Sequence, residues 1–263
     1  MPSGRVFYLK VKAEENLQKL YTRDNATAAE AARRSVDGDD APGGGHYSIS
    51  FYVPSPDGKR VAYGLAASGS EQDVLHIIDV ETGKALTDEI RSHGGRLHES
   101  AVARGRERLL LLALPPARRR RARDRGLQAH QVVPHRVGDK ADNDRLAFAV
   151  DLWPNVTMSD VDFPSIVLTT GSTYAIGKIK HGDSNPLTLY AGPLGKAGDL
   201  SKQGTSSSPW KMVCDVADSV TDFAVRGSDI YLMTCRGASR LQGGEDAARL
   251  AGLCEGDRGR AAG

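Results

Sequence analysis

The sequence of 263 residues predicts an all-β protein, a partial β-propeller built of antiparallel four-stranded blades. Short runs of branched and aromatic residues recur along the chain, tight turns separate them, and no helical pattern intervenes. The repeated order is strand, Ser-Pro-Asp-Gly turn, strand, polar loop, strand and a turn containing Thr-Gly. This order is typical of a propeller blade, so we favour a propeller over a β-sandwich.

Two strands are predicted near the N-terminus, over residues 6–11 and 20–22. Both are rich in aliphatic and aromatic side chains, which favour extended backbone. The segment from Lys12 to Asn16 separates them and is polar, as turns are. We therefore expect two strands of a meander here.

The first complete blade is predicted between Tyr47 and the turn at residues 81–84. Pro56 fixes φ at the second position of its first turn, and Asp57-Gly58 after it tolerates positive φ. Four strands joined by turns are expected, beginning with residues 47–53, 60–65 and 74–80.

The pattern returns twice further along the chain. One copy has strands predicted at residues 165–169, 174–179 and 187–191, and the other at 211–216, 220–225 and 230–234. Gly171 and the segment 226–229 supply tight turns. Two to three four-stranded units are therefore expected in the whole chain.

Composition and spacing exclude several classes of protein. No run approaches the roughly 18 apolar residues of a membrane-spanning helix, and no basic start followed by an apolar run marks a signal peptide. A soluble protein without a membrane partner is expected, with the cytoplasm favoured over the periplasm. The three cysteines show neither CxxC nor Cys/His spacing, and no HExxH occurs, so we expect no metal and no cofactor.

The positive charge is concentrated in one block. Residues 91–125 carry eleven Arg, no Lys and three acids, a net charge of +8, whereas the whole chain has only +2. Such a block is read as a nucleic-acid patch or as a solvated charge run. Because no aromatic residues interleave with the arginines to stack on bases, we expect no nucleic-acid partner.

Several segments together resemble the propeller of the prolyl oligopeptidase family. The strongest is SPDGKRVAYGLAASGSE, within residues 47–71, because it keeps turn, strand and loop in one order. The other four are IIDVETGKAL, HRVGDK, KIKHGDSNPLTLY and DFAVRGSDIYLMT. The resemblance implies a seven-bladed propeller that belongs to a serine-type endopeptidase, a hydrolase of proteolysis.

Two segments depart from the family pattern, residues 92–134 and 241–263. Where the family has a strand of the form W-x-P-D-G-x-G-F-x-Y-S-R, codons permitted for Val102 to Leu114 give WPEGASGFFYSR after a one-base shift. We hypothesise that both segments are out-of-frame translation. Because Arg, Ala and Leu favour helices, the first should be an irregular or helical insert and the second an aberrant tail. Residues 1–91 and 135–240 should carry the N-terminal and C-terminal parts of the propeller.

No catalytic residue can be assigned from the sequence. Nucleophilic catalysis by serine needs a strained GxSxG elbow with His and Asp later in the chain, and none is present. The resemblance implies that the family's Ser, Asp and His lie in a separate α/β-hydrolase domain, which is not visible here. The chain by itself is therefore expected to be catalytically silent.

The resemblance implies two loops as candidate sites of substrate gating or of contact with the hydrolase domain. In the family, the loop that matches Ser68, Gly69, Ser70 and Glu71 presents an acidic residue toward that domain near the substrate entrance. The alternative for Glu71 is a solvated loop carboxylate. The loop containing His181 and Asp183 matches another segment that faces the central chamber.

The preferred interpretation is therefore a fragment of a prolyl oligopeptidase-like peptidase, truncated before the hydrolase domain. In the intact relative, the propeller would admit only short peptides, which are then cleaved after proline. The alternative is a stand-alone propeller that binds a protein partner through its loops. A third interpretation, a basic nucleic-acid binder, rests only on the arginine block.

Overall fold

The computed structural model shows an all-β chain, as the sequence predicts. It describes residues 4–14, 17–28, 47–67, 73–91, 101–102, 108–113, 130–169, 171–194, 208–237, 242–243 and 248–249. The helices in these ranges are two single turns of 3₁₀ type, η2 (Ala141–Asn143) and η3 (Val216–Asp218). No helix among the described residues is long and apolar enough to cross a membrane. The chain divides into two compact units, each described separately below.

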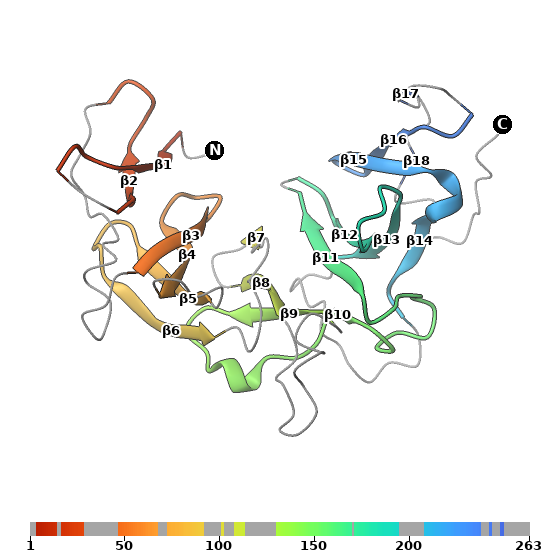
Figure 1. The fold of residues 1–263 in the computed structure, drawn as a ribbon, viewed down its shortest axis with the longest axis horizontal. Coiled ribbons are helices and arrows are strands. Elements are labelled where there is room, and N and C mark those ends of the chain that lie inside the picture. The colour runs from red at the N-terminus through yellow and green to blue at the C-terminus, as the bar shows by residue number, and fades with distance from the viewer. Residues whose placement is uncertain are drawn as a thin grey trace. The chain divides into compact units, whose positions relative to one another are not determined.

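The first unit comprises Met1–Gly126 and His135–Asp144. It begins with a two-stranded sheet of β1 (Val6–Lys10) and β2 (Lys19–Arg23), shown in red in Figure 1. The two strands are antiparallel and place Tyr8 opposite Tyr21, whose rings stack with centroids 5.9 Å apart. The predicted N-terminal pair of strands is confirmed.

The next sheet is the predicted blade. Its strands are consecutive and antiparallel, in the order β3 (Tyr47–Pro54), β4 (Arg60–Ala67), β5 (Asp73–Asp79) and β6 (Ala85–Arg91) (Figure 1). At the Ser-Pro-Asp-Gly turn, the hydroxyl of Ser55 donates to Asp57 at 2.6 Å and accepts from the Arg60 N–H at 3.0 Å. Gly58 has φ +67°, which its missing Cβ permits. The turn therefore forms as its sequence predicts.

Strand β4 is buried on both faces. Val61, Tyr63 and Leu65 pack with Leu20 of β2 in one cluster, whereas Ala62 packs with residues of β5 and β6 in another. Alternate residues of a strand point to opposite faces of the sheet, so one strand can contribute side chains to two hydrophobic clusters. This is why residues 61–66 of the strand are apolar or glycine rather than alternating.

Strands also occur inside the arginine-rich segment. β7 (Ala101–Val102) and β8 (Arg108–Ala113) belong to a four-stranded sheet of order β10-β9-β8-β7, with β9 (Gln131–Arg136) and β10 (Phe148–Ala149). The prediction of an irregular or helical insert is therefore wrong for β7 and β8. Helix propensity differs by less than about 0.7 kcal/mol per ordinary residue, which strand pairing readily overrides.

The second unit comprises Leu127–Pro134 and Arg145–Gly263. Its main sheet has consecutive antiparallel strands in the order β11 (Asp162–Leu168), β12 (Tyr174–His181), β13 (Leu187–Pro193) and β14 (Lys211–Cys214). Residues 211–216 were predicted to belong with the strands that follow them. This prediction is wrong, because Cys214 pairs with Leu189 of β13. The long segment from Leu194 to Trp210 separates β13 from β14, so no short turn in the sequence marks these two strands as neighbours.

A last sheet follows in the same unit. β16 (Asp229–Thr234) pairs with β15 (Val220–Arg226) and also with two short strands, β17 (Gln242–Gly243) and β18 (Ala248–Arg249). The described residues thus form four four-stranded sheets, more than the two to three expected. The additional strands come from the arginine-rich segment and from the C-terminal segment.

Two cores stabilise the second unit. Side chains of β12, β13 and β14 pack with Val220 of β15 and Ile230 of β16. Beside them, the rings of Phe148 and Trp210 have centroids 4.9 Å apart, and Tyr190 lies at the edge of Phe148. Trp210 and Tyr190 have no exposed surface, so this aromatic cluster is closely packed.

Candidate functional site

The first predicted loop lies outside the described residues. Ser68, Gly69, Ser70 and Glu71 connect β4, which ends at Ala67, to β5, which begins at Asp73. This is the connection between the second and third strands of its sheet. The gating role of these residues stays a prediction.

The second predicted loop is described, and its histidine joins three strands. His181 ends β12, and the strand register places it opposite Asp162 of β11. Its Nδ1 lies 3.0 Å from Oδ1 of Asp162, and its Nε2 lies 2.9 Å from Oγ1 of Thr188 on β13. Asp162 is itself fixed, because its Oδ2 accepts from the Ser159 N–H at 2.7 Å.

The order carboxylate, imidazole, hydroxyl resembles the arrangement that activates a nucleophilic serine. Here, however, the hydroxyl belongs to Thr188, which is only 5% exposed, while the His181 side chain is 25% exposed. A peptide carbonyl would have to reach the hydroxyl, and its burial prevents that approach. The three residues therefore act as a crosslink of the sheet, with Asp162 holding the tautomer of His181.

Asp183 lies in the same loop but in a different environment. The N–H of Ser184 donates to the His181 carbonyl oxygen at 2.9 Å, and Gly182 has φ +53°. This closes a tight turn that leaves Asp183 exposed. The structure thus brings His181 and Asp183 together but separates their roles: one is tied into the sheet, and the other carries an exposed carboxylate.

A second histidine network, in the first unit, was not predicted from the sequence. Nε2 of His135 lies 2.9 Å from Oδ1 of Asp88 on β6, and Nδ1 lies 2.9 Å from Oδ2 of Asp144. The side chains of His135 and Asp88 are each 1% exposed, and that of Asp144 is 10% exposed. The only available signal was the histidine of HRVGDK, which follows an apolar strand and precedes a Gly turn.

Burial and the two carboxylates act on His135 in opposite directions. Burial lowers the pKa of His135, because it disfavours the charged ring. Hydrogen bonds and attraction from Asp144 and Asp88 outweigh it, so the pKa is raised above its ordinary value. The network therefore favours the imidazolium form.

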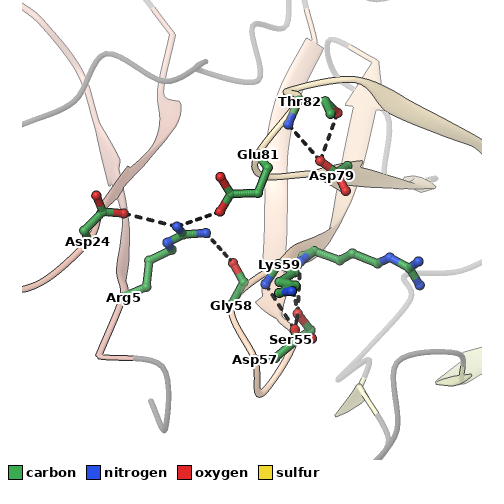
Figure 2. A network of polar contacts seen from close by, with 10 residues as sticks. Arg5, Asp24, Ser55, Asp57, Gly58, Lys59, Asp79, Glu81 and Thr82 are labelled. Carbon is green, nitrogen blue, oxygen red and sulfur yellow. Dashed lines mark hydrogen bonds and ion pairs between the residues drawn. The ribbon is translucent and has the colours of Figure 1, made fainter.

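A polar network at the turns of the first blade holds the N-terminal hairpin (Figure 2). The guanidinium of Arg5 donates to Oε1 of Glu81 at 2.8 Å and to Oδ1 of Asp24 at 3.1 Å. Its other terminal nitrogen donates to the carbonyl oxygen of Gly58 at 2.9 Å. Arg5 thus joins three segments, and a planar guanidinium with several donors suits this role.

The neighbouring turn is fixed by Asp79. Its Oδ1 accepts from the N–H and the hydroxyl of Thr82, at 2.8 and 2.9 Å (Figure 2). The Thr82 N–H, followed by its hydroxyl, holds the pKa of the Asp79 carboxyl below its usual value. The Asp-Val-Glu-Thr-Gly sequence therefore forms a turn that is fixed by its own side chains.

Within the part of the chain that the structure describes, no three His, Cys, Asp or Glu side chains are placed to share a metal ion. Two of the three cysteines are described. Cys214 is buried, and this burial raises the pKa of its thiol to about 12, whereas Cys235 is exposed. The geometry thus places structural crosslinks in both units and leaves the carboxylate of Asp183 exposed on its turn.

The fold of the chain is similar to parts of known prolyl oligopeptidase structures. A search of curated proteins gave no match. Among solved structures, a prolyl endopeptidase is similar with a TM-score of 0.62 and 18% identity, over 94% of this chain and 42% of that one. Prolyl oligopeptidase B from Galerina marginata, bound to a 35-residue hydrolysis and macrocyclization substrate, has a TM-score of 0.67 and 15% identity, over 92% of this chain and 34% of its own.

These likenesses show the fold, and the chain spans about two fifths or less of the length of either enzyme. The family described as prolyl oligopeptidase, N-terminal beta-propeller domain, matches residues 1–162. This match covers more than half of the 263 residues and includes the first blade with its Ser-Pro-Asp-Gly turn. The chain therefore belongs to the prolyl oligopeptidase N-terminal β-propeller domain family.

Proposed function

We propose that this chain is the propeller part of a prolyl oligopeptidase-like serine peptidase and that it controls which peptides reach the hydrolase site. The observation that carries the proposal is the family match over residues 1–162. The propeller pairs with an α/β-hydrolase domain, which carries the catalytic Ser, Asp and His. Short proline-containing peptides are the substrates of the paired domains.

The contact with the hydrolase domain runs through the connections between second and third strands. The Glu71 loop and the Asp183 turn are this same connection in two different sheets. Asp183 supports the proposal because its carboxylate is exposed on a turn fixed by the hydrogen bond from Ser184 to His181. A carboxylate held in this way can pair with a basic residue of the hydrolase domain or with a peptide amino terminus.

The two departing segments are best explained as out-of-frame translation of ordinary family sequence. The support is the string WPEGASGFFYSR, which a one-base shift of residues 102–114 permits where the family has a blade strand. Sequencing the coding DNA tests this directly. If its real codons do not give this string in the shifted frame, the explanation is wrong.

The function is tested by adding a separately produced hydrolase domain of a prolyl oligopeptidase to the purified full chain. We expect measurable association by calorimetry and loss of affinity in Asp183→Asn. Asp160→Asn, at another exposed acid of the same unit, is the matched control and should bind as the parent chain does. Equal affinity of the parent chain and both variants would show that Asp183 does not contribute to the contact. No association at all would contradict the pairing of the propeller with a hydrolase domain.

Activity is tested on the chain alone with a Gly-Pro chromogenic peptide. The proposal expects no release of the reporter above the blank, because the catalytic groups belong to the hydrolase domain. Turnover that a serine-directed phosphonate abolishes would refute it. If the chain binds a different protein and the DNA shows no adjoining hydrolase frame, the stand-alone binding module becomes the better explanation.

A further inference from the structure

The contacts of His135 specify a protonation state. Each ring nitrogen faces a carboxylate oxygen at 2.9 Å, Asp88 on one side and Asp144 on the other. An ionised carboxylate only accepts hydrogen bonds, and a neutral imidazole has one N–H. Both contacts are therefore satisfied when the ring carries both protons, or when one of the two carboxyl groups is protonated.

The surroundings of Asp88 favour the imidazolium. Its Oδ1 accepts from the Gly138 N–H at 2.5 Å as well as facing Nε2 of His135. The Gly138 N–H needs an acceptor at this oxygen, and an ionised carboxylate supplies one. Its Oδ2 is buried without a hydrogen-bond partner in the described structure, so His135 is the cation that compensates this carboxylate.

The network connects elements that are distant in the sequence. Asp88 lies on β6, the edge strand of the β3–β6 sheet, whereas His135 lies on β9 of a different sheet, 47 positions later. Asp144 directly follows the 3₁₀ turn η2. Among the described residues, these two carboxylates are the charged groups that act on the imidazole, one from β6 and one from the segment after η2.

We propose that Asp88, His135 and Asp144 form a proton-operated latch, which holds the edge strand β6 to β9 while the imidazole is doubly protonated and releases it when the ring loses a proton. On release, one ring nitrogen presents a lone pair to a carboxylate, and the buried Asp88 and the part-buried Asp144 lose the charge of the imidazolium. Both changes are repulsive in a buried site. The edge strand then keeps its pairing with β5, its apolar contacts and the hydrogen bond from the Gly138 N–H, but loses the attraction to His135.

The direction of the pH effect follows from the raised pKa of His135. A histidine whose folded pKa exceeds its unfolded value stabilises the fold fully below the unfolded pKa, which is about 6.5. The stabilisation is lost as the pH rises through the folded pKa. The latch is therefore closed below pH 6.5, and it opens as the pH rises through the raised pKa of His135.

The test is hydrogen exchange of the β6 amides in the full chain between pH 6 and 9.5. After correction for the chemical exchange rate, we expect β6 protection to fall by up to about tenfold per pH unit above pH 6.5, the limit for loss of one proton. His135→Gln should show weak β6 protection at every pH. His181→Gln, which removes the histidine of the second unit, is the matched control and should retain the pH response of the parent chain.

Two further results decide the proposal if His135→Gln does not fold. Asp144→Asn removes one carboxylate and should shift the loss of β6 protection to lower pH. Nitrogen-15 spectra of the parent chain at pH 6, below the ordinary histidine pKa of about 6.5, should show both ring nitrogens of His135 protonated. A neutral ring at pH 6, or β6 protection that does not change with pH in the parent chain, would overturn the latch.

Discussion

Arg5 donates from Nη1 to the carbonyl oxygen of Gly58 at 2.9 Å, although 53 positions separate the two residues. The acceptor lies in the Ser-Pro-Asp-Gly turn, whose backbone is fixed by Ser55 and Asp57. A preformed turn thus presents a carbonyl in a defined direction, and the N-terminal hairpin binds to it. Because the Arg5 side chain is only 18% exposed, solvent screens this contact less than an ordinary surface pair.

Replacing Arg5 by Ala should loosen the N-terminal hairpin. We expect the free energy of unfolding to fall by roughly 1–2 kcal/mol, since a hydrogen bond from a charged donor is lost together with two surface ion pairs. Urea unfolding with hydrogen exchange of β1 and β2 measures this loss. Arg226→Ala, at an exposed arginine of the other unit, should change neither quantity. Unchanged protection of β1 and β2 in Arg5→Ala would show that the contact is not stabilising.

Gly192 is required by the aromatic cluster of the second unit. A Cβ at this position would lie 2.9 Å from Cε3 of Trp210, whose ring is fully buried. Gly192→Ala should therefore destabilise the unit by roughly 1–3 kcal/mol through overpacking. Tryptophan fluorescence during urea unfolding measures this loss of stability. Gly227→Asn is the control, because it sits at φ +62° in open space, a conformation that asparagine tolerates.

The strands could be predicted from the sequence where the turns between them are fixed by hydrogen bonds among neighbouring residues. The blade of β3 to β6 follows from the short runs of branched and aromatic residues and from the turn beginning at Ser55, whose side chain makes its own hydrogen bonds. By contrast, β8 was not predicted, because its four leucines suit either a helix or a buried strand. Only pairing with another strand, which a local window does not contain, decides between them.

The candidate site was less predictable than the fold. The exposed position of Asp183 follows from the Gly182 turn, which the sequence shows. The inward role of His181 does not, because it depends on Asp162 and Thr188 of neighbouring strands. His135 was missed for the same reason, since its partner Asp88 lies 47 positions away. Long-range polar partners leave no periodic signal in one sequence.

The crosslink of His181 can be tested by removing its hydroxyl partner. Thr188→Val keeps the shape of the buried side chain but leaves Nε2 of His181 without its 2.9 Å contact. We expect the free energy of unfolding to fall by about 1 kcal/mol, the usual net value of one hydrogen bond. Thr157→Val, at an exposed threonine of the same unit, should be close to neutral. Equal stability of both variants would show that the contact contributes nothing.

The two described cysteines should differ in reactivity. Cys235 is exposed, whereas Cys214 is buried with a thiol pKa raised to about 12 by desolvation. Alkylation requires the thiolate and access to it, so iodoacetamide at pH 8 should modify Cys235 and leave Cys214 intact in the folded chain. Peptide mass mapping distinguishes the two sites, and denaturation in urea should make Cys214 reactive. Rapid modification of Cys214 under native conditions would contradict the packing of β14 against β13.

The arginine block should bind duplex DNA only through charge. Residues 91–125 carry a net charge of +8, and cationic segments bind phosphates by releasing counterions. Contacts with 6–10 phosphates would lose about 10³ to 10⁵ in affinity between 50 and 200 mM salt. We therefore expect weak binding at low salt, no preference among DNA sequences and almost no binding at 200 mM salt.

Fluorescence anisotropy with two unrelated duplexes measures this affinity, and replacing Arg118 to Arg121 by Gln should reduce the affinity at low salt. Binding that tolerates salt and distinguishes the duplexes would instead favour a nucleic-acid binder over a peptidase propeller.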